Sequence, residues 1–357
     1  MGTKALAIDE RSVPAICSLS KALVEKGLYD EAAGVYRKLP APANDHDVVA
    51  YGWLVESLLR NQLFGAGRPL LDRLLDGTGL SVRQRFGHIV QKAVDCWLAD
   101  DVEGCNRYID DTAAISELEG DHNLEHAPKA YAQFLKRLSA NRRHHPELYQ
   151  GQAPDTLHVI GESHCLSPHG TTVDLGGSLY RLESYILMGC KAWQLADPVE
   201  NSYQRAFWSI SSKLPEGANL LVTFGEIDCR VIEGIYPRHK KSDVPLDDII
   251  TLTAGGFVEF VATLAAEKSQ QVNFCGIPAP SPERLIETPL AGSEQAVYLD
   301  MIRRFNIAIE AAATARQLGF VDLYSLTVSE NGLAGGSQHI DGTHLYPSTF
   351  HQALLNA

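Results

Sequence analysis

The stretch that decides the fold is Thr156-Leu-His-Val-Ile160, which is followed directly by Gly161-Glu-Ser-His164. Its first five residues form a nearly continuous apolar or β-prone run, as in a strand that is buried on both faces. Similar runs recur at 184–188, 219–224, 271–277 and 320–323, with helical stretches between them at about 200–214, 246–268 and 295–318. This alternation predicts an α/β domain with a doubly wound, five-stranded parallel sheet.

Polar and glycine-rich segments follow four of these runs. In a doubly wound sheet, ligands bind outside the carboxyl ends of the strands. The segments, in chain order, are Gly161-Glu-Ser-His164, Gly189-Cys-Lys-Ala-Trp193, Gly225-Glu-Ile-Asp-Cys-Arg230 and, after the fifth run, Asp341-Gly-Thr-His344. We therefore expect these segments to meet at one edge of the sheet and to form the functional site.

Three of the residues in these segments have the chemistry of an acyl-transfer site. A serine hydroxyl is a weak nucleophile at neutral pH and needs a base to accept its proton. Histidine suits that task, and an aspartate fixes its tautomer and stabilises the imidazolium. Ser163, Asp341 and His344 supply these types, and the three-residue spacing of the Asp and the His brings both side chains to one side of a turn.

Two of the motifs resemble those of the GDSL or SGNH hydrolases. Gly161-Glu-Ser163 is similar to their Gly-Asp-Ser signature, and Asp341-x-x-His344 is similar to their last motif. The resemblance covers residues 155–350. It implies a flavodoxin-like three-layer α/β/α fold and acyl-ester chemistry, as an esterase, lipase, carbohydrate O-deacetylase or O-acetyltransferase. It also implies that Ser163 is the nucleophile, His344 the base and Asp341 the acid that orients it.

The same resemblance implies an oxyanion hole formed by backbone N–H groups. Gly189 resembles the glycine of the second family motif, whose N–H would line the hole together with that of Ser163. Gly176 and Gly177 are alternative candidates for this glycine.

The third motif departs from the family pattern. The family has Gly-x-Asn-Asp, and its asparagine amide donates to the oxyanion, whereas this chain has Gly225, Glu226, Ile227 and Asp228. Loss of one such donor typically costs about 2.7–4 kcal/mol of transition-state stabilisation. Arg230 is the candidate to replace the donor or to bind an anionic substrate, with Glu226 as its counter-charge.

The first half of the chain has a different, helical periodicity. From Val13 to about Leu138, apolar residues recur at intervals of three and four. A pattern at Leu23, Gly27, Tyr29, Ala32 and Tyr36 recurs 34 residues later at Asn61, Leu63, Ala66 and Leu70, and more weakly at Val102, Cys105 and Ile109.

This spacing resembles the tetratricopeptide repeat. We therefore expect a helical domain at 1–145 and an SGNH-like α/β domain at 155–357. The helices would bind a protein partner, mediate self-association or pack against the α/β domain, and the sequence leaves these alternatives open.

The composition limits the class of protein. A chain of 357 residues exceeds the usual size of a single core, which favours two domains. Its formal charge of −13 argues against a nucleic-acid binder. The seven scattered cysteines indicate neither a disulfide framework nor a zinc ribbon. Because no apolar stretch approaches 18 residues and the N-terminus lacks a secretory pattern, we expect no membrane span and a cytoplasmic location.

No cofactor or metal is expected. Neither a dinucleotide fingerprint nor a phosphate-binding loop follows any of the runs. A metal site could in principle be assembled from acidic and histidine side chains, namely Glu226, Asp228, Asp341, His164, His339 and His344, but they do not form a compact ligand motif.

Two functions remain at this stage. The first is a serine-dependent acyl-ester hydrolase or O-acyltransferase that acts on a carbohydrate or another small hydroxylated substrate. The second is a binding or scaffold protein that works through its helical repeats and carries a catalytically weakened SGNH-like domain. The intact Ser163, Asp341 and His344 favour the first, and the missing asparagine favours the second.

Overall fold

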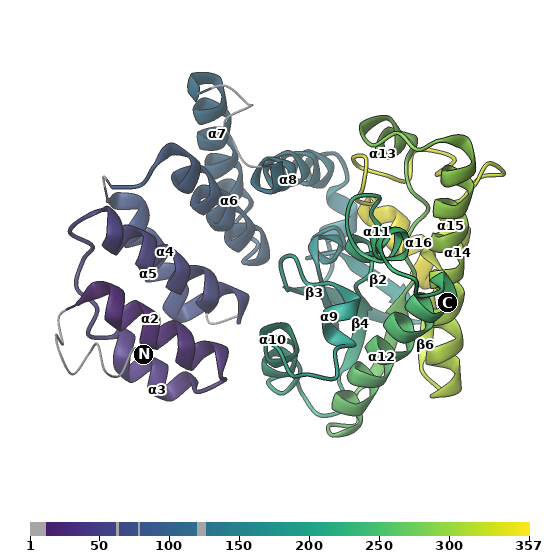
Figure 1. Cartoon of the computed structure of the whole chain (residues 1–357), viewed down its shortest axis with the longest axis horizontal. Coiled ribbons are helices and arrows are strands. Elements are labelled where there is room, and N and C mark those ends of the chain that lie inside the picture. Colours follow the sequence, from purple (N-terminus) through teal and green to yellow (C-terminus); the bar gives the residue numbers. More distant parts are fainter. Residues whose placement is uncertain (1–11, 62–63, 78, 120–125) are drawn as a thin grey trace. The chain divides into compact units, whose positions relative to one another are not determined.

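The computed structural model describes residues 12–61, 64–77, 79–119 and 126–357 (Figure 1). The chain divides into two compact units. One comprises Met1–Ser139 with Arg205–Ile210, and the other comprises Ala140–Gln204 with Ser211–Ala357. The sequence-based expectation that residues 1–145 and 155–357 form two separate domains stays a prediction.

The first unit is built from helices, most of which pack in consecutive pairs. The helices are α2 (Val13–Glu25), α3 (Tyr29–Tyr36), α4 (Asp45–Arg60), α5 (Phe64–Asp76), α6 (Val82–Leu98), α7 (Val102–Glu119) and α8 (His126–His144), the last of which continues into the second unit. Helix α2 packs against α3, α4 against α5 and α6 against α7, and α2 also contacts α4.

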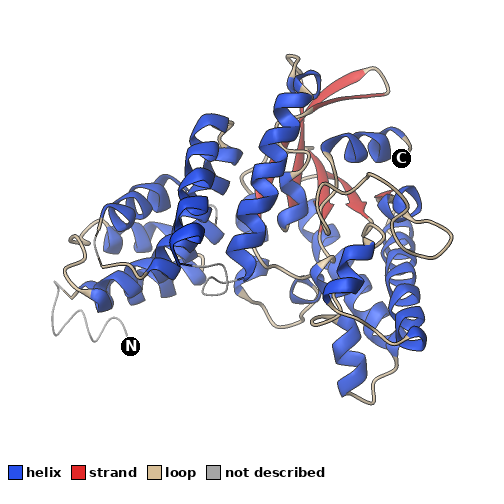
Figure 2. Ribbon diagram, turned by 90° about the horizontal axis from the view of Figure 1, so that it is seen from above, coloured by secondary structure: helices blue, strands red, loops and turns tan. Residues whose placement is uncertain are grey.

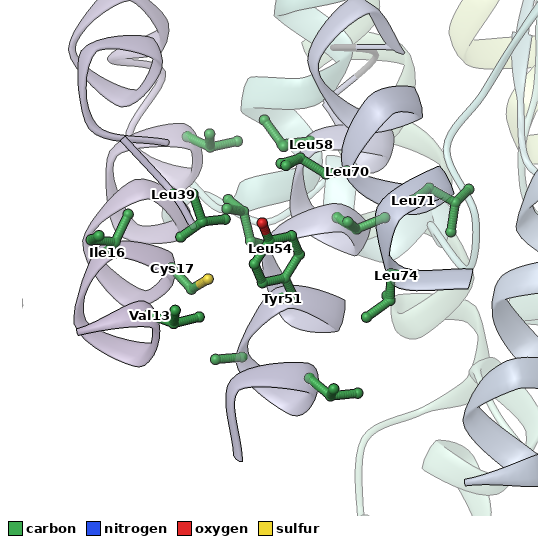
Figure 3. Close-up of a cluster of buried hydrophobic side chains, with 14 of the residues drawn as sticks. Val13, Ile16, Cys17, Leu39, Tyr51, Leu54, Leu58, Leu70, Leu71 and Leu74 are labelled. Carbon is green, nitrogen blue, oxygen red and sulfur yellow. The ribbon is translucent and has the colours of Figure 1, made fainter. Parts of the chain in front are cut away.

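The core of the first four helices is formed around α4 (Figure 3). Tyr51, Leu54 and Leu58 lie on one face of α4 and are fully buried. They belong to one apolar cluster with Ile16 of α2 and Leu71 of α5. The helical spacing of these residues is therefore explained by burial of one face of each helix.

Several residues of the repeated pattern lie at helix ends and crossings. Gly27 has a φ of +74° between α2 and α3, and Ala32 of α3 is fully buried. The Tyr29 hydroxyl lies 3.4 Å from Asn61 Oδ1, which connects two of the equivalent segments. Leu63 lies outside the described residues. The assignment of these helices to the tetratricopeptide class stays a prediction.

The second unit contains a six-stranded sheet (red in Figure 2). Its strands are β1 (Asp155–Gly161), β2 (Thr172–Leu175), β3 (Ser178–Ile186), β4 (Asn219–Thr223), β5 (Gln271–Cys275) and β6 (Gly319–Val321). The helices that follow α8 are α9 (Ala192–Leu195), α10 (Ser202–Ser211), α11 (Ile235–Lys241), α12 (Leu246–Ala266), α13 (Pro282–Glu287), α14 (Gly292–Ala315), α15 (Leu323–Thr327) and α16 (Pro347–Leu355). Short 3₁₀ turns lie at η2 (Pro146–Tyr149), η3 (Ser163–Leu166) and η4 (Ile227–Cys229).

The predicted purely parallel sheet of five strands is wrong, because the sheet is mixed. The spatial order is β2-β3-β1-β4-β5-β6, and β2 pairs antiparallel with β3. The other five strands are parallel. Taken alone, they follow the flavodoxin-like order, in which the second parallel strand lies outside the first.

The additional strand results from a tight hairpin. Gly176 and Gly177 form its two-residue turn with φ of +63° and +89°, and Leu175 pairs with Ser178. Two positive φ angles are what a type I′ turn requires, and glycine adopts them without strain. A Gly-Gly pair between alternating residues is a hairpin signal that the sequence already contained.

Strand β1 lies between β3 and β4 and positions the loops that follow all three. Gly161 is in register with Ile186 of β3 and with Thr223 of β4. The carboxyl ends of the three strands are therefore level, and the segments after them begin at the same edge of the sheet.

Helix α12 is long and apolar enough to cross a membrane by length and composition. In this structure Ile250, Phe257 and Val261 are buried, and the helix packs against α14, α9 and β5. A core helix of an α/β domain has the same composition, so these properties alone do not indicate a membrane.

The core around α4 gives a first testable prediction. Leu54→Ala removes a fully buried side chain and should lower the free energy of unfolding by about 2–5 kcal/mol. Leu28→Ala, at a side chain that is 41% exposed, is the matched control and should change it by about 0.5 kcal/mol or less. Urea unfolding followed by circular dichroism measures both, and equal effects would contradict the assignment of this core.

Candidate active site

The nucleophile candidate lies where β1 ends. Gly161 has no room for a side chain, because a Cβ would overlap Thr223 of the neighbouring strand. The chain then turns into η3, and Glu162 N–H donates to the Thr223 carbonyl oxygen at 3.2 Å. Ser163, the first residue of η3, is 5% exposed. Its hydroxyl is thus held at a defined position at the edge of the sheet.

The structure brings Ser163, His344 and Asp341 together. His344 Nε2 lies 2.8 Å from Ser163 Oγ, and His344 Nδ1 lies 2.8 Å from Asp341 Oδ2. The other carboxylate oxygen of Asp341 accepts from the backbone N–H groups of Thr343 at 2.7 Å and His344 at 2.6 Å. The three-residue spacing therefore closes a turn in which one carboxylate fixes both the backbone and the imidazole.

The charges in this chain of contacts suit a histidine base. Burial opposes the charged form of Asp341, but the hydrogen bond and charge of His344 outweigh it and hold the pKa of Asp341 below its ordinary range. Burial and the charge of His164 lower the pKa of His344, and together they outweigh the hydrogen bond and charge of Asp341, which raise it. At neutral pH a neutral His344 can donate from Nδ1 to Asp341 and accept at Nε2 from Ser163.

Glu162 is a second partner of the serine. Its Oε2 accepts from Ser163 Oγ at 2.8 Å, and its Oε1 lies 2.8 Å from His164 Nδ1. The other ring nitrogen of His164, Nε2, lies 3.1 Å from the carbonyl oxygen of Thr343. Sequence alone predicts Glu162 only as part of the motif around Ser163, and His164 as part of that motif and as a possible metal ligand, although an acid and a base on either side of the serine are a visible signal.

Gly189 lies in the turn that follows β3 and has a φ of +71°. Leu187 N–H donates to the Gly161 carbonyl oxygen at 2.7 Å, which holds the start of this turn beside the segment with Ser163. The alternatives Gly176 and Gly177 precede β3 in an exposed hairpin turn. They lie at the amino end of β3, whereas the site lies at the carboxyl end of that strand. Neither glycine can therefore contribute its N–H group to an oxyanion hole beside Ser163.

Asp228 and Gly225 support the loop after β4. The carboxylate of Asp228 accepts from the backbone N–H groups of Ala192 at 2.7 Å and Trp193 at 3.1 Å, where α9 begins. Burial raises the pKa of Asp228 to about 7. Gly225 has a φ of +121°. Asp228 therefore connects the loops after β3 and β4, and its carboxylate is used by the protein itself.

Glu226 forms the centre of an ion-pair network. Its carboxylate oxygens lie 2.7 Å from Arg230 Nη2 and 2.5 Å from Arg284 Nη2. Burial opposes its charge, but the two guanidinium groups outweigh it and lower the pKa of Glu226 to about 2. Arg230 also contacts Glu233 at 3.1 Å, and Glu233 contacts Lys191 at 3.0 Å. The expected pairing of Glu226 with Arg230 is present, whereas Arg284 of α13 was not foreseen.

The described residues include one cluster with metal-ligand chemistry. Donor atoms of Glu162, His164 and Glu226 lie within 4.8 Å of one another. Each is already engaged, Glu162 by Ser163 and Glu226 by two arginines. Two guanidinium groups beside the cluster repel a cation, so these contacts are better described as an ion-pair network.

Comparison with known proteins gives a likeness in fold. No protein-family model matches the chain, and no curated protein matches it. A GDSL-like lipase from Bacteroides thetaiotaomicron has 17% identity and a TM-score of 0.35, over 61% of this chain and 96% of that one. An extracellular lipase from Streptomyces rimosus has 11% identity and a TM-score of 0.37, over 57% and 99%. A lipase/acylhydrolase from Enterococcus faecalis has 14% identity and a TM-score of 0.34, over 57% and 94%.

These identities and TM-scores are too low to carry an argument about activity. The side chains at the ends of β1, β3 and β4 and in the turn Asp341–His344 are therefore the features of this chain that bear on its function.

Gly225 allows a second prediction, with Gly176 as the matched control because both have positive φ. A Cβ at Gly225 would lie 2.8 Å from both Ile277 and Phe305, whereas at Gly176 it meets open space. Gly176→Ala should lower the free energy of unfolding by about 1–2 kcal/mol through its backbone conformation. Gly225→Ala should cost about 1–3 kcal/mol more through overpacking. Equal losses in urea unfolding would mean that the contact with Ile277 and Phe305 does not constrain this loop.

Proposed function

We propose that the chain is a serine-dependent acyl-ester hydrolase or O-acyltransferase of the SGNH type. The observation that carries this proposal is the continuous chain of 2.8 Å contacts from Ser163 Oγ through His344 to Asp341. These distances are the ones that a nucleophile, its base and the orienting acid require, and the lowered pKa values of His344 and Asp341 favour a neutral base and a charged acid at neutral pH.

The proposed reaction passes through an acyl-enzyme. Ser163 Oγ attacks the ester carbonyl carbon while His344 Nε2 takes its proton, and the imidazolium so formed is stabilised by Asp341. Collapse of the tetrahedral intermediate releases the alcohol, which receives that proton. A water molecule or a second hydroxyl compound then attacks the acyl-enzyme, again with His344 as base, and frees Ser163.

Backbone N–H groups are the proposed oxyanion donors. Those of Ser163 and Gly189 lie in neighbouring turns at the ends of β1 and β3. Ile227 has no donor in its side chain, and Arg230 makes contacts of 2.7 Å to Glu226 and 3.1 Å to Glu233. The guanidinium of Arg230 is thus used in the ion-pair network around Glu226. The proposed oxyanion is therefore bound by backbone N–H groups.

The substrate class proposed is an ester of a carbohydrate or another small hydroxylated compound, in the cytoplasm and without a cofactor. Hydrolysis and transfer share the acyl-enzyme and differ in the acceptor. The helices of the first unit, with consecutive pairs such as α2 with α3 and α4 with α5, are proposed to bind a protein partner or a second copy of the chain.

Ser163→Ala tests the proposal directly. Wild type should hydrolyse p-nitrophenyl acetate and be labelled by a fluorophosphonate probe, and Ser163→Ala should lose the labelling and at least about 1000-fold of the ester turnover. Ser178→Ala, at an exposed serine of β3, should behave as wild type.

The absence of labelling in folded wild type would contradict the proposed enzyme. It would favour the second candidate, a scaffold protein with an inactive SGNH-like domain. The replacement of the family's asparagine by Ile227 is the observation in its favour.

The pH dependence gives a further prediction. The base must be neutral to accept the serine proton, so turnover falls as the pH drops through the pKa of His344. Because burial lowers that pKa, the acid limb of kcat/KM should have its midpoint below the ordinary histidine value of about 6.5. Measurement of p-nitrophenyl acetate hydrolysis between pH 4.5 and 8 in steps of about 0.5 checks this, and a midpoint above about 6.5 would contradict a buried neutral base.

A further inference from the structure

Ser163 Oγ has two acceptors at the same distance. Glu162 Oε2 and His344 Nε2 each lie 2.8 Å away. A hydroxyl has one proton, so it can donate to only one of them at a time. A carboxylate is the stronger acceptor, because hydrogen bonds to charged groups are about twice as strong as those between neutral groups. An uncompensated Glu162 would therefore hold the proton that His344 must receive.

Glu162 is also an unfavourable neighbour for the reaction itself. It is 1% exposed, so solvent screens its charge poorly. The negative charge that develops on the substrate oxygen during attack by Ser163 would be repelled by a carboxylate in contact with that serine. A buried carboxylate in this position needs a positive partner.

His164 has the geometry of that partner. Its Nδ1 lies 2.8 Å from Glu162 Oε1, which is an ion-pair contact and not an aligned hydrogen bond, and its Nε2 lies 3.1 Å from the Thr343 carbonyl oxygen. Neither oxygen can donate, and only the imidazolium has a proton on both ring nitrogens. The neutral ring would turn a lone pair toward one of the two oxygens.

The charged groups around His164 favour the imidazolium. Burial opposes its charge, but Glu162 and Glu226 outweigh it and raise the pKa of His164. The groups that oppose it are His344, whose ring centre lies 4.9 Å away, and His339, whose pKa is lowered by burial and then by His164. Arg230 and Arg284 lie beyond Glu226 and are paired with it.

We propose that His164 is a positioning residue of the active site, which acts as an imidazolium in two ways. It neutralises Glu162, so that the Ser163 proton passes to His344 and the developing oxyanion is not repelled. It also holds the turn Asp341–His344 through the Thr343 carbonyl oxygen. This inference rests on the proposed function.

The test is a histidine titration by NMR that does not depend on turnover. Wild type, His164→Gln, Glu162→Gln and the double variant are titrated with ¹³C-labelled histidine, and signals are assigned with His164→Gln and His344→Gln. His164→Gln leaves Glu162 uncompensated, so the titration midpoint of His344 should rise by about one pH unit. Adding Glu162→Gln should reverse most of this rise, because it removes the unbalanced charge. His158→Gln, at a β1 histidine that contacts Tyr185, should leave His344 unchanged.

The rate of fluorophosphonate labelling against pH gives the second readout. Its acid limb should move upward with the His344 midpoint in His164→Gln and return in the double variant. A merely structural role would lower the rate at every pH without moving the limb, and that result would overturn the proposal.

Two further outcomes keep the inference separate from the proposed function. If wild type is not labelled at all, the proposed function fails while the titration still reports whether His164 sets the charge of His344. If His164→Gln does not fold, His164→Asn assigns the His164 signal instead and the wild-type spectrum decides, because His164 must stay protonated above the ordinary midpoint of about 6.5. A His164 that is neutral at pH 7 in wild type would overturn the proposal.

Discussion

The contact between Ser163 Oγ and His344 Nε2 joins residues 181 positions apart and depends on the position of β1 within the sheet. Strand β1 pairs with β3 and with β4, and Gly161 is level with the last residues of both. Because Thr223 leaves no room for a side chain at Gly161, the chain turns there at a fixed height. The loops after three strands therefore begin at the same edge of the sheet, and Ser163, the proposed nucleophile, is placed there by backbone pairing.

The position of Ser163 at the end of β1 also places several charged side chains in a buried region. Glu162, His164 and Glu226 are close together, and a buried ion is tolerated only when its partners are arranged to replace water. Arg230 and Arg284 neutralise Glu226, and His164 neutralises Glu162. Arg284 connects the loop after β4 to α13, and the charge of Glu226 also acts on His164 in the serine turn. The contacts that hold these segments would therefore also set the charge at the proposed catalytic site.

The parts of the fold and site that could be predicted from sequence are those set by local patterns. Continuous apolar runs predicted β1 and β4 well, since both are buried on both faces, whereas the run at 184–188 meets only the last three residues of β3, most of which is half-buried. The spacing of Asp341 and His344 predicted a turn. Strand β2 was missed because its four residues form an edge with a mixed burial pattern, although Gly176-Gly177 marked its hairpin. The partnership of Glu226 with Arg284, 58 residues apart, could not be predicted because only the folded chain brings them together.

Position 227, where the resembling family has an asparagine, lies beside these charges in the chain. Ile227 is 6% exposed and packs into the protein, while the next residue, Asp228, anchors the start of α9 through two backbone N–H groups. The loop after β4 thus has a structural role but offers no side-chain donor at position 227, so in the proposed reaction backbone N–H groups would bind the oxyanion. With fewer donors, an uncompensated negative charge beside the nucleophile costs more, because less positive potential remains to offset it. Under the proposed function, the absence of an amide side chain at position 227 therefore makes the charge of His164 more important for this site than it would be in a site with a complete oxyanion hole.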